Sequence, residues 1–491
     1  MRRRLARPCL ARPRLGRPLR VLLLAGWTAA CTVGPDYKPD EMDLPSTWTE
    51  HQPSPENRAA ADAALKDWWA SFKDPLLDRL IAQAIAGNED LKLARQRLIQ
   101  ARAGRAIAAS VDYPQVTAGA SRLQSNSSTT IDFPPGIGQY RTWELGFDAS
   151  WEIDIFGGTK RSVEAAEAEI GASIEDRRTI LVSLLAEVAG DYASLRASQL
   201  RLAIALRNIE AARRALDLTQ QEFQRGLGTD LAVAQARAQL NTVRAQPPVF
   251  RAAIARVSHA IGVLVGGFPG DLEAELSKPA PLMTVPGSLP VTLPSETLEN
   301  RPDIRRAERR YAAATARIGV ATAELFPHFS IPLMLDPTSS TIGGLALARS
   351  LDWSIGLAAK GLVYDAGKTD AQVQSAKAGA EAARVAYEQT VHDAFRDVED
   401  ALVNYQTETE RNGTLKEAAA DSDLALDRAT KLYAAGLTDF LKVLDSERTA
   451  FAAEDLEAVS RLATVQNVIA LFKSLGGGWQ GVGFDDVAAA E

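Results

Sequence analysis

The chain has 491 residues, of which 46% are apolar and 24% charged, and its formal net charge is −7. An acidic protein of this kind is a poor candidate for binding nucleic acid, whose phosphates attract cationic proteins. The four histidines are far apart and no nucleophile motif is present, so we expect no enzyme activity, no metal site and no cofactor.

Residues 1–30 have the layout of a secretory signal, with eight arginines, the apolar run Val21–Ala25 and the small pair Ala29–Ala30 before Cys31. The apolar run is too short to span a bilayer. We expect residues 1–30 to be a signal peptide and Cys31 to carry a lipid; the alternative is an ordinary cleaved signal. Cleavage would remove the eight arginines and take the formal charge from −7 to −15.

Two copies of one unit make up most of the chain. Asp90–Leu91 recurs as Asp303–Ile304 after 213 residues, and Gly226–Leu227 recurs as Gly436–Leu437 after 210 residues. We therefore predict an N-terminal lipid-anchored segment at 31–88, a first repeat at 89–302, a second repeat at 303–475 and a C-terminal tail at 476–491.

Each repeat begins with a helix, at 89–112 and at 303–325, and continues with two strands. Apolar and polar residues alternate without interruption over 142–154, which is typical of a strand with two different faces. The second repeat has a matching strand around Trp353, and weaker strands precede the two at 115–124 and 328–335, with loops predicted at 125–139 and 336–346. The apolar face of the first strong strand holds Trp143, Leu145, Phe147 and Trp151, and its polar face holds Glu144, Asp148 and Glu152.

Long helices follow the strands, at 159–225 and 368–435. The first has an apolar residue at every seventh position from Ile174 to Phe223, the spacing of a coiled coil. The segments 229–265 and 438–474 are shorter, and each nearly matches the long helix in length when it is added to the helix at 89–112 or 303–325. We expect these pairs to stack end to end beside the long helices, with a kink at Pro247–Pro248.

A strand with an apolar face and an acidic face suits the wall of a barrel between lipid and water, although one sheet of a soluble sandwich has the same pattern. Four strands cannot close on themselves, and open strand edges are not stable in lipid. A membrane barrel therefore requires several chains. Two chains would give a nearly filled lumen, and three would give an open pore.

Several motifs, in order along the chain, resemble those of the TolC-type outer-membrane efflux lipoproteins, in the NodT-like branch. They are Asp67–Leu77, Asn88–Leu91, Ser150–Gly157, Asn300–Asp303 and Val443–Asp445. The resemblance implies a mostly α-helical homotrimer, with a long coiled-coil α-helical barrel in the periplasm and four β-strands per chain in a shared twelve-stranded β-barrel in the outer membrane. It also implies an RND-type tripartite efflux system, whose other members are a periplasmic adaptor protein and an inner-membrane transporter.

Two helical hairpin tips are candidate docking sites. Glycine ends one helix and Thr or Asp caps the next, which alone predicts a plain helical hairpin. The family resemblance implies in addition that these tips form the periplasmic mouth and dock the adaptor. The residues concerned are Gly226, Leu227 and Thr229 in the first repeat and Gly436, Leu437 and Thr438 in the second.

The resemblance also implies a periplasmic gate at Asp445, where a ring of three carboxylates would narrow the mouth and favour cations. Lys442 stands where the family often has a second acid, and Tyr433 matches a gate tyrosine whose facing position here is Ala232. Contacts between Lys442 and Asp445 could hold the gate, or both side chains could be solvated.

The expected function is that of a passive exit duct for small amphipathic or toxic compounds, anchored in the outer membrane and extending into the periplasm. A duct for type I protein secretion and a periplasmic coiled-coil scaffold without a pore are the alternatives. The uninterrupted alternation over 142–154 argues against the scaffold. The stretch Gly361–Thr369 resembles a phosphate loop but has five residues between its glycines where that loop has four, so no nucleotide site is expected.

Overall fold

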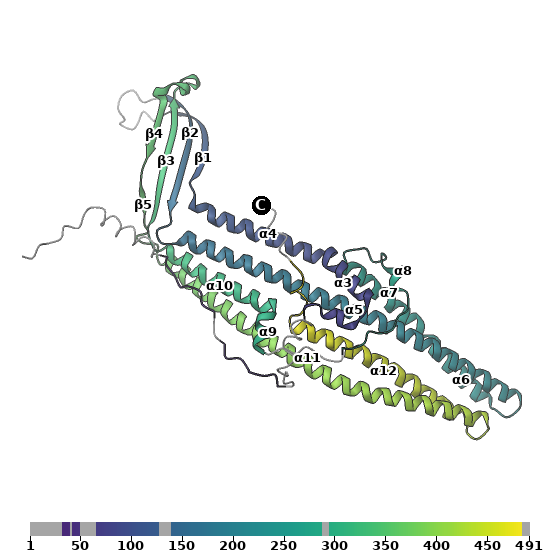
Figure 1. Cartoon of the computed structure of the whole chain (residues 1–491). Helices are drawn as coiled ribbons and strands as arrows, with labels where there is room; N and C mark the ends of the chain where they lie inside the picture. The colour runs from purple at the N-terminus through teal and green to yellow at the C-terminus, as the bar shows by residue number, and fades with distance from the viewer. Residues whose placement is uncertain (1–31, 40–41, 50–64, 127–138, 287–293, 484–491) are drawn as a thin grey trace, which may run out of the picture. The chain divides into compact units, whose positions relative to one another are not determined.

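The computed structural model describes residues 32–39, 42–49, 65–126, 139–286 and 294–483 (Figure 1). The chain divides into two compact units. The first joins the N-terminal segment up to Pro39 with Gln100–Ile170 and Arg309–Arg384, and the second joins Asp40–Ile99, Gly171–Glu308 and Val385–Glu491. Each unit takes pieces from both sequence repeats, because each repeat contributes strands to the first unit and a helical hairpin to the second.

The first unit contains one antiparallel sheet, whose strands lie side by side in Figure 1 in the order β1-β2-β3-β4. The strands are β1 (Gln115–Asn126), β2 (Gln139–Ile153), β3 (His328–Ser339), β4 (Leu351–Ile355) and β5 (Ala358–Lys360). The fourth predicted strand is thus split into β4 and β5, which both pair with β3. Between them, the Gly356 N–H donates to the Pro332 carbonyl at 3.1 Å, which keeps this segment alongside β3.

The loop predicted at 336–346 begins too early. Asp336 and Pro337 look like turn residues, but they still pair with Asp352 and Leu351 across the sheet. The connection consists instead of two short 3-10 helices, η5 (Ile342–Ala346) and η6 (Ala348–Ser350). Cross-strand pairing has overridden the local turn preference of these two residues.

Two helices of 67 residues each follow the strands, α5 (Gly158–Gln224) and α11 (Lys368–Ala434). The heptad pattern of α5 is buried at Leu181, Val188 and Leu195, whereas Phe223 at its end is 47% exposed. A straight helix drifts by about 20° per heptad from a strict seven-residue repeat, so the apolar stripe turns away from its contacts along the helix.

A return helix runs back beside each long helix. In the first repeat it consists of α6 (Asp230–Arg244) and α7 (Gln246–Leu264), and in the second of the uninterrupted α12 (Phe440–Ser474). The kink predicted at Pro247–Pro248 is confirmed as a break at Ala245. Proline lacks the N–H that a helix interior needs but fits the first turn of a new helix, which is where Pro247 lies in α7.

The predicted end-to-end stacking is confirmed by contacts at two joints within the second unit. At the first joint, Asn88 precedes α4 (Glu89–Ala109) and its Nδ2 donates to the carbonyl of Leu264, the last residue of α7, at 3.0 Å. At the second joint, Arg301 precedes α10 (Pro302–Ala323) and its Nη1 donates to the carbonyl of Ser474, the last residue of α12, at 2.9 Å. A 3-10 turn, η4 (Ser110–Asp112), leads from α4 to β1.

The core of the second unit includes residues of the short elements η3 (Trp68–Phe72), α3 (Pro75–Gly87) and α8 (Glu273–Leu276). The short helix α9 (Pro294–Asn300) precedes the second joint. Trp68 stacks on Phe472 of α12 with ring centroids 5.1 Å apart, and both are buried. Asp74 caps α3 through the N–H groups of Leu76 and Leu77 and accepts from the Tyr192 hydroxyl of α5 at 2.7 Å. The motif at 67–77 therefore joins α5 of the first repeat to α12 of the second repeat.

Among the residues that the structure describes, no helix combines the length and the apolar character needed to cross a membrane.

Candidate functional site

The sheet has one apolar face, as the alternation predicts. Trp143, Leu145, Phe147 and Trp151 lie on the same side of β2, and Leu335 of β3 pairs with both Phe147 and Trp353. Phe147 is 54% exposed and Trp353 63% exposed. This row of large apolar side chains crosses three strands and is exposed in the described chain; exposed apolar patches are typical of surfaces that contact another apolar phase or a partner.

The opposite face of the sheet is acidic. Glu144, Asp148 and Glu152 of β2 lie on it, and in the next strands Asp336 of β3 faces Asp352 of β4. Near the end of the sheet, His328 Nδ1 lies 2.6 Å from Glu152 Oε1, so one carboxylate has a partner of opposite charge when the imidazole is protonated. A face of this composition favours water and cations over lipid.

Both hairpin tips have the same backbone geometry. After α5, the Gly226 N–H donates to the Phe223 carbonyl and the Leu227 N–H to the Glu222 carbonyl; after α11, Gly436 and Leu437 donate to Tyr433 and Leu432 in the same pattern. These are the two bonds of a Schellman motif. Gly226 has φ 76° and Gly436 has φ 72°, values that residues with a Cβ rarely adopt. The two sequence repeats therefore end their long helices with the same turn.

The tips present leucine to solvent. Leu227 is 76% exposed and Leu437 is 74% exposed, and Leu231 and Leu441, in the first turn of each return helix, are exposed as well. Thr229 caps α6 by accepting from the Ala232 N–H, but the cap of α12 is Asp439, which accepts from the Lys442 N–H. Thr438 is not the cap, since it occupies the position of Gly228 in the first tip.

The three predicted gate residues lie close to the second tip but in different surroundings. Lys442 and Asp445 are exposed on α12, and no ion pair joins them in the described structure. Tyr433 is half-buried and its ring packs against Phe440 with centroids 5.6 Å apart, beside the buried Ala232. Burial raises the pKa of Tyr433, and the carboxylate of Glu222 adds to that shift. The contact between Lys442 and Asp445 that could hold the gate is absent within this chain.

Glu447 is a buried carboxyl group that the sequence reading did not single out. It is 2% exposed, on the face of α12 that also carries Val443 and Leu444, and its Oε1 has no hydrogen-bond partner. Burial raises the pKa of Glu447 to about 7, although Arg448 acts in the opposite direction. The only sign of this burial in the sequence is the position of Glu447 on the apolar side of the helix. That sign is weak, because α12 carries charged residues both before and after this position.

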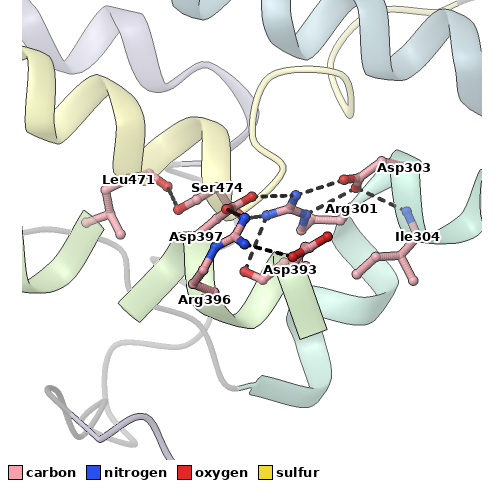
Figure 2. A network of polar contacts seen from close by, with 9 residues as sticks. Arg301, Asp303, Ile304, Asp393, Arg396, Asp397, Leu471 and Ser474 are labelled. Atoms are coloured by element: carbon pink, nitrogen blue, oxygen red, sulfur yellow. Dashed lines mark hydrogen bonds and ion pairs between the residues drawn. The ribbon is translucent and has the colours of Figure 1, made fainter. Parts of the chain in front are cut away.

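The second joint is a charged network (Figure 2). Arg301 is bidentate to Asp303, with Nε to Oδ1 at 3.1 Å and Nη2 to Oδ2 at 2.8 Å, and its Nη2 also reaches Asp397 of α11 at 3.3 Å. Asp397 is shared with Arg396. Burial alone raises the pKa of Asp303, but the hydrogen bonds and charge of Arg301 outweigh burial and hold that pKa below its usual value. The Asn300–Asp303 motif thus ties the start of α10 and the end of α12 to the middle of α11.

The loop that resembles a phosphate loop is a helix cap. Asp365 accepts from the N–H groups of Gly367 and Thr369 and from the Thr369 hydroxyl at the start of α11. The residues described by the structure contain no group of three His, Cys, Asp or Glu that could hold a metal ion. Cys31, the predicted lipid attachment site, lies outside the described residues.

Comparison with known proteins agrees with this architecture. Residues 80–267 and 293–477 match the model of a family described as outer membrane efflux protein. The chain is 29% identical to the cation efflux system protein CusC of Escherichia coli O6:H1 over 92% of this chain and 96% of that protein. It is also 29% identical to the toluene efflux pump outer membrane protein TtgI of Pseudomonas putida, over 94% of this chain and 98% of that protein. The solved structure of the outer-membrane channel OprN is similar with a TM-score of 0.82 and 36% identity, over 92% of this chain and all of that one.

Proposed function

The chain belongs to the outer membrane efflux protein family, and from that premise we propose that it is the passive exit duct of a tripartite pump for small amphipathic or toxic compounds. The observation that carries the proposal is the sheet, with an exposed row of large apolar side chains on one face and carboxylates on the other. Such a sheet suits a wall between lipid and a water-filled lumen.

The duct is a homotrimer in this proposal. Within the described residues, β1 pairs only with β2 and β4 pairs only with β3, so both edges of the sheet are open. Open edges are unstable in lipid, because backbone groups there have no water to bond. The β4 edge of one copy would pair with the β1 edge of the next, and three copies would complete a twelve-stranded barrel whose acidic faces line the pore. The long helices would form the periplasmic tunnel.

The hairpin tips are the proposed contact with a periplasmic adaptor protein, which links the duct to an inner-membrane transporter. Leu227 and Leu437 are exposed on turns with the same hydrogen-bond pattern, and exposed apolar side chains suit recognition by a partner. Asp445 of three chains would form the carboxylate ring of the mouth, close to Lys442 and Tyr433. Contacts across the trimer would hold the gate, since none between Lys442 and Asp445 exists within one chain.

The proposed location is the outer membrane, with a lipid on Cys31 after removal of residues 1–30. Labelled palmitate should stay with the protein, and a Cys31→Ser variant should carry none. Equal label in both forms would remove the lipid anchor from the proposal without affecting the duct.

The barrel is tested by a matched pair of substitutions on one strand. Arg at Leu145 should destabilise the trimer by about 2 to 4 kcal/mol if this position lies near the bilayer midplane, whereas Arg at Asp148, on the other face, should be tolerated. The measurement is the yield of folded trimer in vesicles together with single-channel conductance. A protein without conductance would be a scaffold, and equal loss of trimer from both variants would contradict the barrel.

The transported compounds are tested in a deletion strain. Loss of resistance to solvents, antibiotics or metal cations with an unchanged set of secreted proteins supports a pump duct. Loss of a secreted protein with unchanged resistance would point to the secretion alternative.

A further inference from the structure

The segment that follows Cys31 is fastened to the foot of the sheet. Within the first unit, the Val33 N–H donates to the carbonyl of Phe156, in the turn between β2 and α5, at 3.0 Å. Arg161, on the first turn of α5, donates back from Nε to the Val33 carbonyl at 3.1 Å and from Nη2 to the Gly34 carbonyl at 3.3 Å. Backbone groups of residues 33 and 34 therefore bind the segment from Phe156 to Arg161.

Arg161 is buried to an unusual degree for a charged side chain, at 4% exposed. Its Nη2 lies 2.6 Å from Asp36 Oδ1 and its Nη1 lies 2.7 Å from Glu164 Oε2, so each of its three nitrogens has an acceptor. A guanidinium is rarely buried unless it is paired in this way. Two of the three nitrogens bind residues 33–36, so the N-terminal segment supplies most of what compensates the buried charge.

Three glycines make room for the same segment. A Cβ on Gly34 would lie 2.4 Å from the Cα of Gly319 in α10, and a Cβ on Gly157 would lie 2.7 Å from Thr32. A Cβ on Gly319 would lie 2.6 Å from Cγ of Arg161 and 2.9 Å from the carbonyl oxygen of Val33. Tyr37 completes the seat with an edge-to-face contact to Tyr311 of α10, with centroids 5.3 Å apart. The close glycine contacts and the hydrogen bonds of Arg161 therefore hold this segment in the same position.

We propose that residues 32–38, together with Arg161, Gly157 and Gly319, form an N-terminal clasp that fixes where the lipid of Cys31 enters the membrane. The inference rests on the lipid anchor of the proposed function. Thr32 lies against Gly157 in the turn that follows β2, and the residue that would carry the lipid is bonded directly to Thr32. Consecutive Cα atoms are about 3.8 Å apart, so the tether from a fastened Thr32 is one residue long, whereas seven unfastened residues could reach roughly 25 Å. Arg161 is a positioning residue, because it delivers the lipid to the foot of the strand that carries Trp151.

The test measures the mobility of the clasp in the full-length protein in lipid vesicles. A nitroxide on Pro35→Cys reports on it, since Pro35 is exposed between Gly34 and Asp36 and the thiol of an acylated Cys31 is unavailable for labelling. The label should be immobile in the parent. Arg161→Gln and Gly319→Leu should convert it to the nanosecond motion of a free terminus and broaden its depth in the bilayer, read by oxygen and a nickel chelate.

The matched control is Gly379→Leu on α11, where a Cβ meets nothing within 4 Å, and its label should stay immobile. Asp36→Asn keeps an acceptor oxygen but loses the negative charge opposite Arg161, so it should give an intermediate mobile fraction. This milder variant keeps the test decisive if Arg161→Gln or Gly319→Leu does not fold. An immobile label in every variant, or a mobile label in the parent, would overturn the clasp. The mass of the mature N-terminal peptide shows separately whether Cys31 carries a lipid. An unacylated peptide with an immobile label would contradict the lipid anchor, although residues 32–38 would still be held by Arg161.

Discussion

The two return helices cover the same span of their repeats but are built differently. α6 and α7 together run from residue 230 to 264, and α12 runs from 440 to 474, an offset of 210 at both ends. The first is broken before Pro247 and ends at a neutral joint made by Asn88. The second is continuous, contains the buried Glu447 and ends at the charged joint of Arg301. One backbone geometry is thus stabilised by an amide in one repeat and by an ion network in the other.

The difference shows which features the architecture demands. Both joints need a donor to the last carbonyl of the return helix, because the C-terminal carbonyls of a helix have no partner within it. Asn88 meets this need while its Oδ1 caps α4 through Asp90 and Leu91. Arg301 supplies this donor from a charged guanidinium, which also binds the carboxylates of Asp303 and Asp397. Both repeats have the hydrogen bond to the last carbonyl of the return helix, but the donor is a neutral amide in one and a charged guanidinium in the other.

The largest effect is expected from Arg301→Met. Removing the guanidinium leaves Asp303 without its partner at a largely buried site, and breaking a buried pair in this way costs about 3 to 5 kcal/mol. Chemical unfolding of the purified protein in detergent measures the loss. Arg317→Met is the control, because the exposed pair of Arg317 with Glu169 should contribute less than about 1 kcal/mol. Similar losses from both variants would show that the second joint is not special.

Glu447→Gln should remove a pH dependence of the folding stability. The first repeat has no such dependence, since the equivalent residue there, Arg237, is exposed. The folded pKa of about 7 lies above the ordinary value of 4.5, so the full stability is present below pH 4.5 and is lost as pH rises through 7. The loss should be roughly 1 to 3 kcal/mol. Unfolding at pH 5 and pH 8 tests it. A parent protein with the same stability at both pH values would contradict it.

Asn88→Ala should cost about 1 to 2 kcal/mol, because it removes the cap of α4 together with the donor to Leu264 but leaves no charge unpaired. Its effect should also be independent of pH, whereas the second joint should weaken in acid. The pKa of Asp303 is depressed in the fold, so its contribution is present above about pH 4 and is lost as pH falls through the folded value. Unfolding of Asn88→Ala at pH 3 and pH 6 checks the first joint; a loss that changes with pH would mean that the two joints are coupled.

The smallest effect on stability is expected from Asp445→Ala, within about 0.5 kcal/mol, since the side chain is an exposed helix residue in one chain. Its effect should be on conduction: the variant should change single-channel conductance and weaken block by multivalent cations. Gln235→Ala, at the equivalent position of the first return helix, is the control and should leave both unchanged. An Asp445→Ala channel with parental conductance and block would remove this residue from the proposed gate.

Local features of this protein could be predicted well from its sequence. The alternation over 142–154 predicted β2 and its two faces, Gly226 and Gly436 predicted both tips, and Pro247–Pro248 predicted the break in the first return helix. These features depend on neighbouring residues, because period, turn conformation and the missing N–H of proline act within a few positions. Where local signals competed with pairing, as at Asp336 and Pro337, the sequence predicted a loop and the sheet contained a strand.

Contacts between distant residues were decided by the tertiary structure alone. Arg161 meets Asp36 across 125 residues, Asn88 meets Leu264 across 176, and Arg301 meets Ser474 across 173. The sequence marks Arg301 and Asn88 as parts of motifs but does not say which carbonyl each will bind. Glu447 likewise is one of many helix carboxylates until packing buries it. Periodicity is a property of a segment, whereas burial and pairing depend on what the rest of the chain places against it.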